Sequence, residues 1–198
     1  VMLAVGFGII VHIILREGYE SAVTLPVLVP TQTGLWRDAM KTSLAVLLVG
    51  GVGWWAHWFY FASRELRSVL RQIYLYIFAL LGGFITSLVS VGAILFGVLG
   101  WLMGVPEAEA ASAHFRFLPG AAASLSVGMG LWLYHWMVLQ REVDVSPLGE
   151  RSSRRAYVYI VAALGLGALA VGVGVAVTNA VAIFVESARD VVAGPDFW

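Results

Sequence analysis

The residues with the greatest chemical potential in this sequence are two histidines, His57 and His135, each inside a Trp-x-x-His-Trp motif. The tryptophans of the two motifs are Trp54, Trp58, Trp132 and Trp136. An imidazole nitrogen is a suitable axial ligand for haem iron or chlorophyll magnesium, and the flanking rings can pack against such a macrocycle. One interpretation is therefore a cofactor-binding site for haem or chlorophyll, in which a bis-histidine haem requires His57 and His135 to face each other.

A second interpretation of these residues needs no cofactor. His57 precedes Arg64 by seven residues, which is about 10 Å of helix and places it near the boundary between hydrocarbon and headgroups. Tryptophan is enriched at that depth because its ring is apolar while its N–H reaches polar groups. The imidazoles then only hydrogen-bond a backbone carbonyl, a lipid phosphate or an arginine-rich loop.

The other histidines are weaker candidates. His12 lies in an apolar run, where an ionisable residue is a functional candidate, but it precedes Arg16 by only four residues and can mark the membrane surface instead. We expect His114, near Glu107 and Glu109, to be a solvated loop residue. Cysteine is absent, which excludes disulfides and thiolate metal sites. No metal site and no hydrolase or nucleotide-binding motif is recognisable, so we expect a protein that is not an enzyme.

The elements that position these residues are long apolar segments. The sequence is 60% hydrophobic and 12% charged, against roughly 45–50% and about 25% in soluble domains. Its five apolar runs are 1–15, 43–62, 73–103, 118–139 and 157–185. All but the first reach the roughly 20 residues that a bilayer requires. The expected fold is an all-α integral membrane protein, a bundle of five transmembrane helices in a single domain, 1–198.

The runs form two kinds of segment, which predicts tandem helical hairpin repeats. The A segments, 43–62 and 118–139, carry the Trp-x-x-His-Trp motifs. The B segments, 73–103 and 157–185, begin with Tyr-x-Tyr-Ile after arginines. The first run aligns with the end of a B segment, so the expected pieces are a partial B helix, 1–15, and two A–B hairpins, 42–103 and 117–185. We therefore expect an interior piece of a longer repeat protein, continuing beyond both ends.

Charge predicts the orientation in the membrane. Arginines concentrate in the segments 63–72 and 140–156, which we expect on the cytoplasmic side. The segments 16–41, 104–117 and 186–198 should lie on the other side, with 16–41 as a surface loop. Basic and acidic residues are equally numerous, twelve each, so nucleic-acid binding is not expected.

Polar residues inside the spans are few and uncharged. Ion-coupled transporters and proton relays depend on buried charges, so transport by such a mechanism is not expected. Thr86, Ser87 and Ser90, with Thr178 and Asn179, are typical of hydrogen bonding between helices. A polar cavity near them would instead favour a small-molecule carrier or channel.

The Trp-x-x-His-Trp and Tyr-x-Tyr-Ile motifs together resemble a bacterial family of repeated membrane hairpins of unknown function, which is common in green non-sulfur bacteria. The matching positions are Trp54, His57, Trp58, Arg71, Tyr74, Tyr76, Trp132, His135, Trp136, Arg155, Tyr157 and Tyr159. The resemblance implies the architecture and carries no activity.

The function expected from these observations is a non-catalytic membrane subunit, a scaffold or accessory component of a larger complex such as a photosynthetic or respiratory one. Its partners are then other membrane proteins and lipid, in the inner (plasma) membrane of a bacterium, which the chain crosses several times. The alternative is a haem- or chlorophyll-binding protein that uses His57 and His135.

Overall fold

The computed structural model describes residues 1–23, 35–61, 74–104, 110–142 and 149–193. The chain divides into two compact units, Val1–Ser153 and Arg154–Trp198, and each is described by itself. The regular elements of the described residues are all helical. Five helices are long and apolar enough to cross a membrane, as expected from the five apolar runs.

The first unit is built from four long helices and several short helical segments. Its long helices are α1 (Met2–Val23), α2 (Leu35–Trp55), α4 (Gly82–Leu102) and α6 (Leu118–Glu142). Its short segments are the π-helices η1 (Ala56–Phe61) and η3 (Tyr74–Leu81), the one-turn helix α5 (Ala111–His114) and the 3₁₀ turn η4 (Phe115–Phe117). Since η1 extends α2 and η3 leads into α4, both π-helices lie at junctions between a span and a connection.

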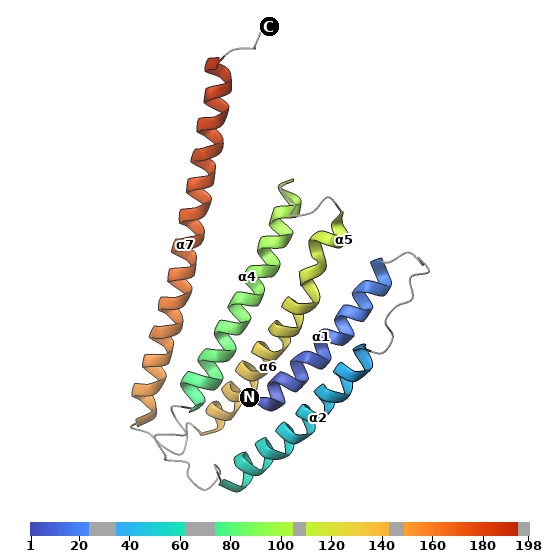
Figure 1. Ribbon diagram of the computed structural model, residues 1–198. Coiled ribbons are helices and arrows are strands. Elements are labelled where there is room, and N and C mark those ends of the chain that lie inside the picture. Colours follow the sequence, from blue (N-terminus) through green and yellow to red (C-terminus); the bar gives the residue numbers. More distant parts are fainter. Residues whose placement is uncertain (24–34, 62–73, 105–109, 143–148, 194–198) are drawn as a thin grey trace. The chain divides into compact units, whose positions relative to one another are not determined.

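The long helices of this unit lie side by side in the order α2, α1, α6, α4 (Figure 1). Neighbours run in opposite directions. The Tyr19 hydroxyl near the end of α1 donates to the carbonyl of Ser112 in α5, 2.7 Å away, so the end of α1 lies beside the approach to α6. The starts of α1 and α4 and the ends of α2 and α6 therefore share the other end of the unit.

Glycines allow the closest approaches between these helices. A Cβ atom on Gly50 would collide with the backbone of Met2 and Leu3, and one on Gly128 would collide with that of Gly83 and Ser87. Each glycine precedes the first tryptophan of a Trp-x-x-His-Trp motif by four residues. Close backbone contact of this kind supplies van der Waals attraction where lipid removes the hydrophobic driving force between helices.

Helix α1 is longer than the sequence predicts, and both ends of the expected surface loop are helical. The apolar run 1–15 falls short of a span, yet α1 continues through the polar residues to Val23. Arg16 and Glu20 form an i,i+4 ion pair there, with Nε and Oε1 2.6 Å apart, which supports a helical surface. On the other side, α2 already begins at Leu35. The prediction of a loop over 16–41 is therefore wrong at both ends, and 24–34 lies outside the described residues.

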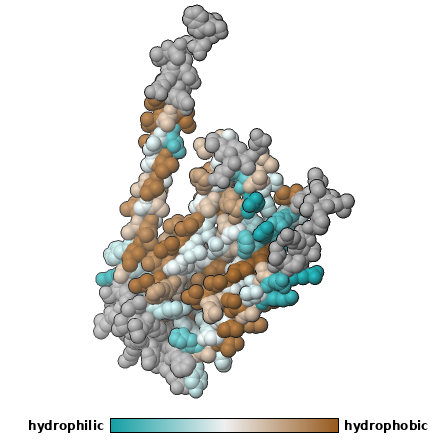
Figure 2. Space-filling view, in the orientation of Figure 1, coloured by the Kyte–Doolittle hydropathy of each residue, from teal (hydrophilic) through white to brown (hydrophobic). Residues whose placement is uncertain are grey.

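Apolar side chains cover much of the surface of the helices. Figure 2 shows hydrophobic residues along the helix bodies and hydrophilic ones where α1 ends and α2 begins. Large exposed residues include Leu48, Val52, Phe78, Val89 and Phe96. A water-soluble monomer rarely exposes continuous apolar surface of this extent, so the pattern is that of helices that face lipid or other helices.

The second unit consists largely of one helix, α7 (Gly149–Ala193), of 45 residues. Its length is about 68 Å at 1.5 Å per residue, which exceeds the roughly 30 Å of the hydrocarbon core. Only the part Arg154–Val185 has the composition of a span. The 45 residues of α7 are therefore more than one perpendicular crossing of a bilayer needs.

Candidate functional site

An aromatic cluster around His135 is the most distinctive site in the first unit. The imidazole ring of His135 contacts the rings of Trp58, Tyr74 and Tyr134 at centroid distances of 6.0, 6.0 and 5.0 Å, each close to edge-on. Trp54 stacks on Trp58 with centroids 6.4 Å apart and meets Tyr134 edge-on at 5.7 Å. The cluster joins residues that are up to 81 positions apart, Trp54 and His135 (135 − 54 = 81).

Four helical segments bring these rings together, and α2 supplies Trp54. His135 and Tyr134 lie on α6, Trp58 lies on η1, and Tyr74 opens η3. A π-helix is rare and is found most often at functional sites, because its extra residue per turn re-aims the side chains. Here two π-helices flank the same histidine. Two of the five rings of the cluster, those of Trp58 and Tyr74, thus come from segments that depart from α-helical geometry.

The hydrogen bonding of His135 determines the state of its ring. Its Nδ1 lies 2.8 Å from the carbonyl oxygen of Leu131. A carbonyl only accepts, so Nδ1 carries the proton and donates it. In a neutral ring Nε2 then has a lone pair. This nitrogen is buried and has no hydrogen-bond partner among the described residues, and the whole residue is 2% exposed. Unpaired buried polar atoms are uncommon and invite a functional explanation.

A pocket of about 320 Å³ lies beside the cluster, between α1, α2, α6 and η3. Its walls include His135, Tyr134, Tyr74 and Trp54, and the remainder is mainly aliphatic. The lining contains no charged side chain. It is thus an apolar pocket with a few polar groups at one end, the usual composition of a small-molecule site.

A second pocket, of about 560 Å³, adjoins the first along α1 and α6. The two share Val1, Ala4, Val127 and Leu131. The second pocket also borders His12, which is half-buried with its ring near Gly120. His12 therefore lies on an internal helix contact and not at the end of α1, because the helix continues for eleven residues beyond it (23 − 12 = 11).

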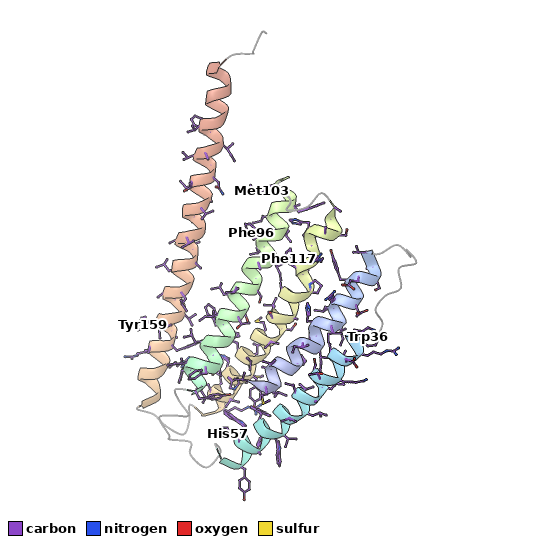
Figure 3. The ribbon with its side chains drawn as sticks, viewed as in Figure 1. Trp36, His57, Phe96, Met103, Phe117 and Tyr159 are labelled. Carbon is purple, nitrogen blue, oxygen red and sulfur yellow. The ribbon has the colours of Figure 1, made fainter. Side chains whose placement is uncertain are left out.

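The structure separates the two histidines that the motif makes equivalent. His57 is exposed and Figure 3 places it where α2 passes into η1, whereas His135 is buried. The first copy contributes Trp54 and Trp58 to the cluster, and the second contributes His135. Trp132 and Trp136 stack on each other with centroids 6.0 Å apart. Tyr74 and Tyr134 were not predicted as site residues, although Tyr134 directly precedes the motif histidine and Tyr74 belongs to the Tyr-x-Tyr-Ile motif.

The prediction for His114 is wrong. This residue is 5% exposed, and its Nε2 donates to the carbonyl of Gly97 at 2.8 Å. Its ring packs against Trp101, with centroids 5.4 Å apart. The reason is that α5 folds back on α4, and Phe117 in the following turn lies over Gly97. The aromatic residues on both sides of His114 were the signal in the sequence, because a solvated loop has no need of them.

The hydroxyl groups inside the spans bond to their own helices. Thr86, Ser87 and Ser90 each donate to the carbonyl four residues earlier, at 2.8 Å, and Thr178 does so at 2.9 Å. The expected hydrogen bonds between helices are therefore not what satisfies these groups. Thr86 borders the larger pocket, but its hydroxyl already donates a hydrogen bond to the carbonyl of Gly82.

Comparison with known proteins now identifies the family. The model of the family described as Domain of unknown function (DUF5671) matches residues 1–122. The chain belongs to this family. The match extends from α1 to the start of α6, so it includes His57, Trp58 and Tyr74 but not His135. No curated protein and no solved structure matches the chain. The expectation of a family of unknown function is confirmed.

The cluster has some but not all features of a macrocycle site. A metal-binding histidine usually donates its second ring N–H to a carbonyl, and His135 does so. However, protein atoms cover its Nε2, so a macrocycle cannot reach that atom unless the surrounding rings move. Among the described residues no group of three or more possible metal ligands occurs.

Proposed function

We propose that this protein is a non-catalytic subunit of a larger membrane assembly, in the inner membrane of a bacterium, and that it acts through contacts inside the bilayer. The five spans in this proposal are the five apolar helices. None of the stretches 1–15, 42–60, 74–102, 117–140 and 156–185 contains Asp, Glu, Lys or Arg. These five stretches offer a partner mainly apolar surface of the kind that packs inside a bilayer.

The observation that carries the proposal is an exposed stripe on α4. Ile85, Val89, Phe96 and Leu99 are exposed large residues of the first unit, and Gly92 lies among them. Their spacing of three or four residues places them on one face of the helix. Within that unit, nothing lies within 4 Å of a Cβ built on Gly92. A small residue between large ones is the shape that a partner helix packs against in a membrane.

We also propose that the first unit arose by duplication of a helix pair. Supporting this, Gly50 and Gly128 hold matching places in the two Trp-x-x-His-Trp segments, and each approaches the backbone of the long helix that precedes it in the chain. If the two segments were similar only by chance, there would be no reason for their glycines to pack in the same way. We also propose the orientation that the charges predict, in which residues 63–72 and 140–156 lie in the cytoplasm.

Native electrophoresis of gently solubilised membranes tests the subunit proposal. The full chain should migrate in a complex much larger than 21.4 kDa, together with other proteins. A Gly92→Leu variant should be released from that complex while remaining folded, because within the first unit a Cβ on Gly92 meets no atom within 4 Å. Val91→Leu, on another face of α4, is the matched control. Migration of the unaltered chain as a lone small protein counts against the proposal.

A haem- or chlorophyll-binding protein is the second candidate, and the Nδ1 bond of His135 is what favours it. The test is an absorption spectrum of the chain purified from its native membrane. A Soret or near-infrared band that disappears in His135→Phe but not in His57→Phe would support a single axial ligand. Absence of any such band rules this candidate out.

A further inference from the structure

We infer that the paired pockets bind an amphiphile with a flat quinone-type headgroup, the ring lying at the His135 cluster and an apolar tail lying between α1 and α6. The inference goes beyond the proposed subunit role and rests on different residues. It begins with the polar atoms that the fold leaves without partners at one end of an apolar space.

Three such groups belong to residues that line the smaller pocket. His135 Nε2 is an acceptor with no partner among the described residues. The hydroxyls of Tyr74 and Tyr134 also have no hydrogen-bond partner in the described part of the chain, and both residues line the pocket. Together they offer one acceptor and two groups that both donate and accept. A hydroquinone can donate an O–H to Nε2, and a quinone carbonyl can accept from a tyrosine.

The shape of the pocket favours a flat ring. Its polar end is walled by the rings of Trp54, Tyr74 and Tyr134, and its volume of about 320 Å³ is at the small end of the range for ligand sites. Aromatic walls stabilise a planar ligand by stacked or edge-on contact. A macrocycle is a larger plane and must coordinate Nε2 directly, whereas a six-membered ring with oxygen substituents needs only one hydrogen bond to it.

The second, adjoining pocket has room for the apolar tail of the ligand. The lining residues that α6 contributes to the two pockets extend from Gly120 to His135, about 22 Å of helix at 1.5 Å per residue. The shared walls, Ala4, Val127 and Leu131 among them, are aliphatic. An acyl chain of a lipid alone would fill this space but would leave Nε2 unpaired.

Entry of the ring requires a small movement. Because protein atoms cover Nε2, one of the neighbouring rings must turn before a ligand reaches it. Tyr74 is the ring with most freedom, since it is 40% exposed while Trp58 is 8% exposed. It also belongs to a π-helix, whose hydrogen-bond pattern is less regular than that of an α-helix. Tyr74 is thus both a wall of the site and its entrance.

The experiment uses the purified full chain in nanodiscs and measures quenching of tryptophan fluorescence. The probes are a decyl-substituted benzoquinone and its hydroquinone, and decylbenzene, which has the tail without oxygen atoms, is the control ligand. The unaltered protein should bind the quinone pair saturably and decylbenzene at least tenfold more weakly. His135→Phe retains an aromatic ring without Nε2 and should weaken hydroquinone binding roughly fivefold, as loss of one hydrogen bond does. Tyr134→Phe should weaken quinone binding roughly threefold on the same basis.

A variant that fills the pocket distinguishes loss of quinone binding from loss of folding. Gly130 lines the smaller pocket, and a Cβ there meets no atom within 4 Å, so Gly130→Leu should fill the site without disturbing the helices. We expect it to reduce quinone binding at least tenfold. Gly53→Leu, at an equally open glycine outside the pocket, and His57→Phe should bind as the unaltered chain does. Equal quenching of all variants, or equal affinity for decylbenzene, overturns the inference, because either result means nonspecific partition. A bound macrocycle in the purified chain overturns it as well.

Discussion

The two Trp-x-x-His-Trp segments share a sequence pattern and differ in their surroundings. His57 is exposed at the end of α2, whereas His135 is buried among aromatic rings on α6. The residue before the histidine is Ala56 in the first segment and Tyr134 in the second. Helix α6 lies between α1 and α4, while α2 lies at the end of the row (Figure 1). The comparison teaches that a repeated motif does not imply a repeated site, because burial depends on the position of the helix.

The largest expected effect tests what the two segments have in common. Gly50→Leu and Gly128→Leu should each prevent folding, since the new side chain collides with backbone and backbone cannot yield as a flexible side chain does. Gly53→Leu and Gly130→Leu are matched controls at open positions and should fold. The measurement is the yield of monodisperse protein after detergent extraction. If only one of the two packed glycines proves sensitive, the segments do not pack alike.

The second-largest expected effect is a difference between two tryptophans of the first Trp-x-x-His-Trp segment. Trp58 is 8% exposed and reaches the cluster around His135, whereas Trp55 is 60% exposed. Trp58→Ala should lower the free energy of unfolding by about 3 kcal/mol through lost burial and the cavity left behind. Trp55→Ala should lower it by less than about 1 kcal/mol. Equilibrium unfolding in mixed detergent, followed by circular dichroism, measures both. Equal losses would show that Trp58 is not part of the core.

The histidines themselves should differ by a smaller amount. His135→Ala removes a buried ring and its hydrogen bond to Leu131, and should lower the free energy of unfolding by about 2 kcal/mol. His57→Ala should change it by less than about 0.5 kcal/mol, as is usual for exposed positions. The same unfolding experiment applies. The distinction drawn between the two segments fails if His57→Ala is the more destabilising substitution.

The smallest expected effect concerns Tyr134 and tests whether its ring shields His135 from chemical modification. Histidine modification by diethyl pyrocarbonate, located by mass spectrometry, should label His57 and spare His135 in the unaltered chain. Tyr134→Ala should make His135 reactive while lowering the free energy of unfolding by only about 1 kcal/mol, since Tyr134 is half-buried. Phe at this position should keep the shield and serves as the control. Continued protection in Tyr134→Ala would assign the shielding to Trp58 or Tyr74.

The amino-acid sequence alone determined the number and type of the long apolar elements. An apolar run of about 20 residues without charge has few structures open to it except a helix, because in lipid the backbone must satisfy its own hydrogen bonds. For the same reason the absence of buried charge and the membrane composition were evident without coordinates. The ends of the helices were not evident from the sequence, since ion pairs such as Arg16–Glu20 stabilise helical turns beyond the apolar run.

Only the tertiary structure decided which of the matching residues form a site. Local sequence sets the face of a helix on which a histidine lies, but not whether another helix covers that face. The burial of His135 depends on Trp58 and Tyr74, which arrive from other segments, and the burial of His114 depends on α5 folding against Trp101 and Gly97. These contacts join residues 13 to 77 positions apart (114 − 101 = 13; 135 − 58 = 77). Contacts over such separations depend on how the whole chain packs, and no periodicity within one segment encodes them.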